Sequence, residues 1–171
     1  DSLRFREKNA IAEAEKLYAE DVEFFKFLQY AFEKQWLGLK KYANENGVKI
    51  IGDIPIYVSY DSADVWCNPS QFDLNKGLLP KMVAGCPPDE FSEKGQLWGN
   101  PLYNWSAMKK EADPYSWWCR RIKSTLKIYD VIRIDHFRGF ESYYAIPYGA
   151  DDATDGKWKK GPGSQFFEYL N

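Results

Sequence analysis

The sequence has few of the residues that build metal centres and disulfide frameworks. Among 171 residues there is one histidine, His136, and there are three cysteines, Cys67, Cys86 and Cys119, at wide spacings. An odd number of widely spaced cysteines argues against a disulfide framework and against a CxxC site. A zinc site or a Ser-His-Asp set would have to be built around the single histidine. We therefore expect reduced thiols and no His-rich metal site.

Long apolar runs and an excess of one charge are also missing. No stretch approaches the roughly 20 apolar residues that a membrane helix needs, and no leader with a cleavage site is visible. The net charge is −2, and the 23 basic and 25 acidic residues form no basic stripe for a phosphate backbone. These absences predict a cytoplasmic protein with no membrane and no nucleic acid as a partner. The hydrophobic content of 44% suits one globular domain.

Two helix-then-strand units stand out in the spacing of apolar residues. Steps of three and four predict a helix from residue 8 to about 44, which Asn46-Gly47 ends. The β-branched run at 48–53 predicts a buried strand. A second helix is expected from a cap at 113 to about 129, followed by a buried strand over 131–135. This alternation predicts an α/β protein with a parallel sheet.

Residues 54–105 lie between these units and show no sustained period. They contain most of the prolines and many glycines, aspartates and aromatic residues. Connections of this length are uncommon and serve as active-site lids or binding loops, or are disordered. The many aromatic side chains make disorder the weakest of these choices. We expect a folded, functional loop region.

Asp53 and Asp135 end the two predicted strands, where barrel enzymes of the (β/α)₈ type place their chemistry. An aspartate in this position can also simply cap the next turn. Arg133 precedes Asp135 by two residues, so both side chains share one face of the strand. The guanidinium would keep the carboxylate ionised, as a nucleophile at an anomeric carbon requires. A structural ion pair is the alternative.

Aromatic residues make up 18% of the chain, and between 96 and 105 they alternate with polar ones. Sugar rings pack their C–H faces on aromatic rings while their hydroxyls bind polar side chains. This segment is therefore a candidate sugar-binding surface. The alternative is that its aromatic residues belong to the core.

Five segments together carry a family resemblance: GDIPIYV at 52–58, DSADVW at 61–66, VAGCPPD at 83–89, GQLWGNPLYNW at 95–105 and RIDHFRG at 133–139. In this order they resemble the 4-α-glucanotransferases known as amylomaltases or disproportionating enzymes. These are the family 77 glycoside hydrolases, which are related to the α-amylases. The match runs from about residue 17 to the end of the chain.

The resemblance implies a (β/α)₈ TIM barrel of the α-amylase type, with long loops over the active-site cleft. Residues 1–171 would be part of this catalytic barrel, and 54–105 its substrate-binding loop region. The implied reaction moves a segment of an α-1,4-glucan to a new 4-hydroxyl on glucose or another glucan, with retention and through a covalent glycosyl-enzyme. The implied partners are α-1,4-glucans and maltooligosaccharides. No metal and no organic cofactor is implied.

The resemblance also assigns roles to individual residues. Asp135 matches the nucleophile, and Arg133 the catalytic arginine beside it. A mobile loop over the cleft is implied for residues 85–98. The residues expected to contact the substrate are Asp53, His136, Phe91, Gln96, Trp98, Asn100 and Pro101.

The chain begins without methionine and stops at what looks like the start of a helix, so we expect an internal fragment. A retaining mechanism needs a second carboxyl group as acid and base. In the family this glutamate lies on a later strand, beyond Asn171, and Glu141 fits no family acid position. Two alternatives remain open from the residues alone: an α-amylase-type hydrolase and a non-catalytic glucan-binding module.

Overall fold

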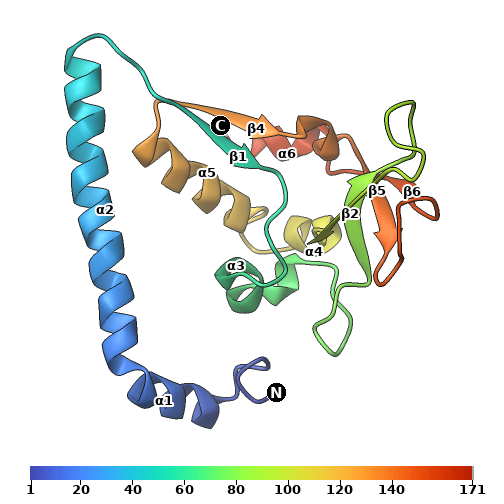
Figure 1. Cartoon of the computed structure of the whole chain (residues 1–171), viewed down its shortest axis with the longest axis horizontal. Coiled ribbons are helices and arrows are strands. Elements are labelled where there is room, and N and C mark those ends of the chain that lie inside the picture. The colour runs from blue at the N-terminus through green and yellow to red at the C-terminus, as the bar shows by residue number, and fades with distance from the viewer. Residues whose placement is uncertain (171) are drawn as a thin grey trace. The chain divides into compact units, whose positions relative to one another are not determined.

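Helices and strands are mixed along the chain (Figure 1). A computed structural model describes residues 1–170. The elements are α1 (Lys8–Leu17), α2 (Ala19–Glu45), β1 (Ile51–Pro55), α3 (Ala63–Cys67), η1 (Pro69–Gln71), β2 (Met82–Cys86), β3 (Gln96–Pro101), α4 (Trp105–Lys109), α5 (Ser116–Ile128), β4 (Val131–Asp135), η2 (Phe137–Phe140), β5 (Ser142–Pro147), β6 (Lys157–Lys160) and α6 (Ser164–Glu168). Strands β1 and β4 are hydrogen-bonded neighbours in a two-stranded sheet.

The two predicted helix-then-strand units are present, with corrected boundaries. Strand β4 has the predicted bounds, whereas β1 begins three residues later than expected and runs on to Pro55. Both strands were predicted to be buried, and this was wrong for the described residues: apart from Gly52 their residues are exposed or half-buried, because β1 and β4 form a sheet of only two strands here. The first helix is interrupted at Tyr18, whose φ of −108° and ψ of 23° lie outside the helical range. The helix predicted from Asp113 begins only at Ser116, because Tyr115 has a positive φ of 57°. A left-handed residue breaks the helical path, so Asp113 does not cap α5.

The stretch expected as a loop region, residues 54–105, contains short regular elements. Helices α3 and η1 and strands β2 and β3 all lie within it. Strands β2 and β3 pair antiparallel with each other, and β2 also pairs with β5, so segments far apart in sequence build one sheet. The strand order is β3-β2-β5-β6, so part of the predicted loop region consists of hydrogen-bonded strands.

The chain divides into two compact units, of which the first comprises residues 1–52 and 124–132. In this unit two side chains of α2 form hydrogen bonds to backbone carbonyls at the C-terminal end of α5. Trp36 donates to the carbonyl of Ile128 at 2.7 Å, and Lys40 donates to that of Tyr129 at 3.1 Å. These bonds satisfy carbonyls that a helix end leaves without partners, and Lys40 adds a favourable charge there. Gly52 lies against Tyr129, and a Cβ at Gly52 would come within 2.1 Å of that ring.

The second unit comprises residues 53–123 and Arg133 to the end of the chain, and its core is aromatic. Trp118 of α5 is fully buried and contacts Tyr103 and Phe140 with ring centroids 5.4 and 5.2 Å apart. The Arg121 guanidinium lies 4.8 Å from the Trp118 ring and donates to the carbonyl of Ile56 at 3.0 Å. The aromatic core thereby fixes the backbone that leaves β1. This segment leads directly to the site described below.

Within residues 1–170, no helix is both long enough and apolar enough to cross a membrane. All three cysteines are free thiols.

Candidate active site

Three charged side chains meet where β1 and β4 end. The Arg133 guanidinium donates two hydrogen bonds to the Asp53 carboxylate, from Nε to Oδ1 at 3.0 Å and from Nη2 to Oδ2 at 2.5 Å. The same Nη2 lies 3.7 Å from Oδ1 of Asp135. The hydrogen bonds from Arg133 hold the pKa of Asp53 below its ordinary value, and Asp53 in turn raises the pKa of Arg133. Arg133 and Asp135 thus lie on one face of β4, but the closer partner of the arginine is Asp53.

His136 turns the chain directly after Asp135. Its φ of 54° and ψ of 42° are left-handed, a conformation that is uncommon for residues other than glycine. In a continuing strand, consecutive side chains would point to opposite faces. Because the strand ends here, Asp135 and His136 both line the same pocket. Strain of this kind is concentrated at functional sites.

The His136 imidazole is packed between aromatic rings. Its centroid is 4.9 Å from that of Trp98, with the ring planes at 88°, and 6.3 Å from that of Tyr57. Burial is the main cause that lowers the pKa of His136, so the neutral ring predominates at pH 7. Its Nε2 is buried and has no hydrogen-bond partner within residues 1–170. A buried polar atom of this kind is suited to a ligand hydroxyl.

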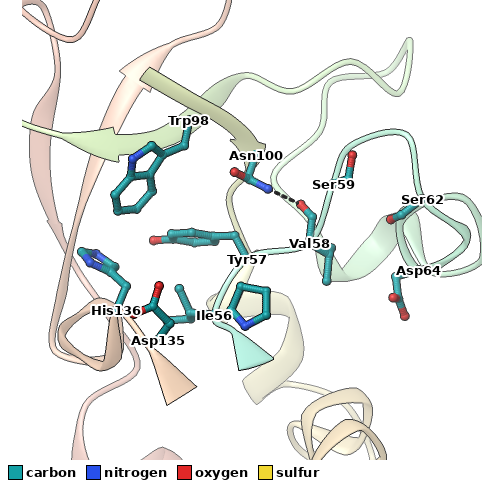
Figure 2. A pocket seen from close by; sticks show the side chains of 11 residues that line it. Ile56, Tyr57, Val58, Ser59, Ser62, Asp64, Trp98, Asn100, Asp135 and His136 are labelled. Atoms are coloured by element: carbon teal, nitrogen blue, oxygen red, sulfur yellow. Dashed lines mark hydrogen bonds between the residues drawn. The ribbon is translucent and has the colours of Figure 1, made fainter. Parts of the chain in front are cut away.

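A pocket of about 480 Å³ opens beside these residues (Figure 2). Its volume lies in the range of roughly 300–1,000 Å³ that is usual for small-molecule sites. The wall comes from the segment after β1, the start of α3, strand β3 and the end of β4. The lining residues are Pro55, Ile56, Tyr57, Val58, Ser59, Ser62, Asp64, Trp98, Asn100, Asp135 and His136.

Strand β3 supplies Trp98 and Asn100, which are two residues apart and so share one face. Asn100 donates through Nδ2 to the carbonyl of Val58 at 2.9 Å. Gln96, predicted as a substrate contact, accepts a hydrogen bond from the Trp98 indole at 3.0 Å and lies outside the pocket lining. Pro101, also a predicted contact, is fully buried, which leaves no surface for a sugar.

The predicted mobile loop 85–98 includes the end of β2 and the start of β3, and residues 87–95 connect these two strands. Phe91 projects from this connection and is 90% exposed. The Asp89 carboxylate accepts hydrogen bonds from the backbone N–H groups of Phe91 and Ser92, at 2.9 and 2.8 Å. On the other side the carbonyl of Lys94 accepts from Ala153 N at 3.0 Å. The base of the connection is therefore tied to the segment between β5 and β6.

Four of the predicted site residues line the pocket: Trp98, Asn100, Asp135 and His136. The other five, Asp53, Phe91, Gln96, Pro101 and Arg133, lie outside its lining, although Asp53 and Arg133 border Asp135.

The part of the wall that follows β1 was not predicted from the sequence. Tyr57 is 6% exposed and stacks on Tyr103 with ring centroids 6.0 Å apart, and burial strongly raises the pKa of its phenol. Ser59, Ser62 and Asp64 complete this wall. The segments GDIPIYV and DSADVW already contained Tyr57, Ser62 and Asp64, but neither has a periodic pattern that would have marked these residues as a pocket wall.

This arrangement suits sugar chemistry. The Asp135 side chain is 65% exposed, so its carboxylate is open to attack an electrophilic carbon, with a guanidinium beside it. Trp98 and Tyr57 offer ring surface, and His136 and Asn100 offer polar atoms that orient a ligand. Within the described residues 1–170, no three His, Cys, Asp or Glu side chains gather as metal ligands would.

Comparison with known proteins agrees with this chemistry. A family model described as 4-alpha-glucanotransferase matches residues 1–171. The chain is 53% identical to a 4-alpha-glucanotransferase of Clostridium butyricum over 169 residues, which are 98% of this chain and 34% of that protein. The chloroplastic/amyloplastic 4-alpha-glucanotransferase of Solanum tuberosum is 46% identical over 170 residues, 99% of this chain and 29% of the plant protein. The chain therefore spans about a third of the length of these relatives.

A solved structure gives the same result. The amylomaltase from Streptococcus agalactiae in complex with acarbose superposes with a TM-score of 0.94 at 46% identity. The match covers 99% of this chain and 34% of that one.

Proposed function

Since the chain belongs to the 4-alpha-glucanotransferase family, we propose that it carries the nucleophile and part of the substrate cleft of an enzyme that transfers α-1,4-glucan segments. The observation that carries this proposal is the placement of Asp135. Its carboxylate lies at the end of β4, lines the pocket and has the Arg133 guanidinium 3.7 Å away.

In the proposed reaction an oxygen of Asp135 attacks the anomeric carbon of a glucose residue in the chain. The glycosidic C1–O4 bond breaks, and the leaving 4-oxygen takes a proton from a general acid. A 4-hydroxyl of glucose or of another glucan then attacks the same carbon, the ester to Asp135 breaks, and the hydroxyl proton returns to the acid/base group. Two inversions give overall retention. In this scheme the acid/base group is a glutamate that lies beyond Asn171.

Arg133 and Asp53 support the nucleophile in this proposal. The two hydrogen bonds to Asp53 fix the plane of the guanidinium, so Nη2 of Arg133 stays directed to Asp135. The neighbouring positive charge favours the ionised carboxylate that attacks. Asp53 would then act through Arg133 in addition to the substrate contact predicted from the sequence.

His136, Trp98 and Asn100 would hold the sugar. The neutral His136 offers a buried nitrogen to a hydroxyl, and Trp98 offers its indole to a ring face. The amylomaltase from Streptococcus agalactiae forms a complex with acarbose, which supports a sugar-like ligand for this cleft. Phe91, on the exposed connection between β2 and β3, would cover the bound glucan and keep water out.

The wider setting is also part of the proposal. Each of the two neighbouring strands β1 and β4 follows a helix, as strands of a (β/α)₈ barrel do. We place them in such a barrel, with residues 54–105 over its cleft. The cytoplasmic location remains a prediction.

The test is incubation of the full-length protein with maltotriose. Transfer predicts glucose together with a ladder of longer maltooligosaccharides, and Asp135→Asn should lower the rate by several orders of magnitude while glucan binding persists. Asp155→Asn, an exposed carboxylate outside the pocket lining, is the matched control and should keep full activity. Glucose and maltose without longer chains would mean hydrolysis. Activity of Asp135→Asn within tenfold of the unchanged protein would overturn the assignment of the nucleophile.

A further inference from the structure

A hydrogen-bond network supports the pocket wall that follows β1. The Arg121 guanidinium of α5 donates from Nη2 to the carbonyl of Pro55 at 2.6 Å and from Nη1 to the carbonyl of Ile56 at 3.0 Å. The Tyr103 hydroxyl donates to the same carbonyl of Ile56 at 2.6 Å and accepts from Nη1 of Arg121 at 3.3 Å. Arg121 and Tyr103 both lie outside the pocket lining.

We propose that Arg121 is a positioning residue for the glucan transfer: it sets the course of the chain from Ile56 to Tyr57 and thereby the pocket wall beside Asp135. In this role Arg121 touches no reacting atom and acts through the residues that it orients. The inference rests on the proposed function, because the rate of transfer at Asp135 is the quantity that the positioning changes.

The directions of two carbonyls show how one guanidinium can set this course. In an extended strand the carbonyls of consecutive residues point in opposite directions across the sheet. Those of Pro55 and Ile56 both accept from the same guanidinium, so the chain leaves the extended path at Ile56. Seven of the eleven residues that line the pocket belong to residues 55–64. A change in this turn would therefore move most of the wall.

The aromatic core holds the guanidinium in place. Its central carbon lies 4.8 Å from the ring centroid of Trp118 and 5.5 Å from that of Trp117, and both rings are buried. A cation is attracted to the face of an indole ring. The planar guanidinium also presents its donors in a rigid fork, which a lysine ammonium does not. Arg121 can therefore hold two successive carbonyls at a fixed separation.

Tyr57 is oriented through its backbone and through its ring. Its backbone follows Ile56 directly, and its ring stacks on Tyr103 with the centroids 6.0 Å apart and the planes at 23°. Burial raises the pKa of the Tyr103 phenol, so the hydroxyl stays protonated and can donate to Ile56. Figure 2 shows the Tyr57 ring pointing toward His136, and the two ring centroids are 6.3 Å apart. The network thus ends at a ring of the pocket.

Arg121→Lys in the full-length protein separates positioning from packing. Lysine keeps the positive charge and the apolar stem, but its single ammonium cannot replace the fork that holds both carbonyls. We expect kcat/KM on maltotriose, corrected for the folded fraction from urea unfolding, to fall about tenfold. The matched control is Arg120→Lys, because Arg120 is an exposed neighbour on α5 that donates to Ser116, and this variant should leave kcat/KM unchanged.

A double-mutant cycle tests whether the effect passes through Tyr57. In protein that carries Tyr57→Leu, Arg121→Lys should lower kcat/KM by less than about twofold more, because the ring that it orients is gone. If Arg121→Lys does not fold, Tyr103→Phe takes its place in the cycle, with an expected loss of about threefold that is confined to protein with Tyr57.

Full activity of folded Arg121→Lys would overturn the positioning role. The same loss with and without the Tyr57 ring, for whichever variant is used in the cycle, would also overturn it, since the effect would then not pass through Tyr57. Failure of the unvaried protein to form longer chains from maltotriose would instead refute the proposed function.

Discussion

Gly139 is the position where a single methyl group should disturb the site most directly. It lies in η2, and a Cβ added there would come 2.7 Å from Cδ1 of Ile56 and 3.3 Å from Cδ2 of His136. Carbon atoms pack best at about 3.5–4.0 Å, so in Gly139→Ala the Ile56 side chain must move by roughly 1 Å. Ile56 is only 1% exposed, and because it lines the pocket, a shift of its side chain changes the wall of the site.

Overpacking of this kind costs about 1–3 kcal/mol of unfolding free energy. A displacement of about 1 Å in a catalytic site can lower the rate by about 100-fold. We therefore expect Gly139→Ala to unfold at lower urea concentration and to lower kcat/KM on maltotriose by about 10- to 100-fold. Both quantities are measured on the same purified protein.

Gly38 provides the matched control. It lies inside α2, and a Cβ there meets no atom within 4 Å. Gly38→Ala should stabilise the protein by about 0.5–1 kcal/mol, because alanine favours the helix, and it should leave the kinetics unchanged. Normal stability and normal kinetics of Gly139→Ala would refute the close packing of Ile56 and His136 around this glycine.

Three further predictions concern the side chains of the site. Trp98→Ala or Phe91→Ala should raise the ratio of free glucose to new oligosaccharides, because water gains access to the glycosyl-enzyme; an unchanged ratio for both would remove these rings from the cleft. Asp53→Asn should lower kcat about tenfold or more, because it weakens the paired hydrogen bonds that orient the Arg133 guanidinium. A kcat equal to that of the unchanged protein would refute the role of Asp53 in positioning Arg133. Burial lowers the pKa of His136 in the folded protein. As the pH is lowered below about 6.5, the unfolded state therefore binds the proton first, and the unfolding free energy decreases. Urea unfolding between pH 5 and 8 should show this slope, and His136→Asn should reduce it; equal slopes in the two proteins would contradict the burial of the imidazole.

The sequence predicted those parts of the fold that depend on local patterns. Strand β4 was predicted residue for residue, because the run Val131 to Asp135 combines β-branched residues with an alternation of faces. The backbone break at Tyr18 was missed, because the sequence has no Gly or Pro there to mark it. The late start of α5 was missed for a related reason, since a positive φ at Tyr115 is rare for an aromatic residue.

The antiparallel sheet was outside the reach of such patterns. Strand β2 pairs with β5, about 60 residues later, so its partner cannot be inferred from its own short sequence. The run of prolines and glycines in 54–105 indicated loops, and tertiary pairing determined the strands.

The candidate site divides in the same way. Asp135 and its proximity to Arg133 follow from the period of two in a strand, and the structure bears out this proximity at 3.7 Å. Arg133 is closer to Asp53 than to Asp135, and this depends on the pairing of β1 with β4, since Asp53 and Arg133 are 80 residues apart in the sequence. The pocket wall formed by Ser59, Ser62 and Asp64 depends on the path of the chain after β1, because Arg121 and Tyr103 both donate to the carbonyl of Ile56. Contacts between segments that are distant in the sequence cannot be predicted from the periodicity of either segment.

Asp135 is proposed to form a covalent bond with the sugar, and a trapping experiment tests this central step most directly. The full-length protein is incubated with a fluorinated glucosyl fluoride that forms the glycosyl-enzyme but releases it slowly, and it is then digested and mapped by mass spectrometry. We expect one added glycosyl group, located on Asp135 and absent from the Asp135→Asn variant. A label on Asp53 or on any other carboxylate, or full turnover of the reagent with no label, would contradict the assignment of Asp135 as the nucleophile.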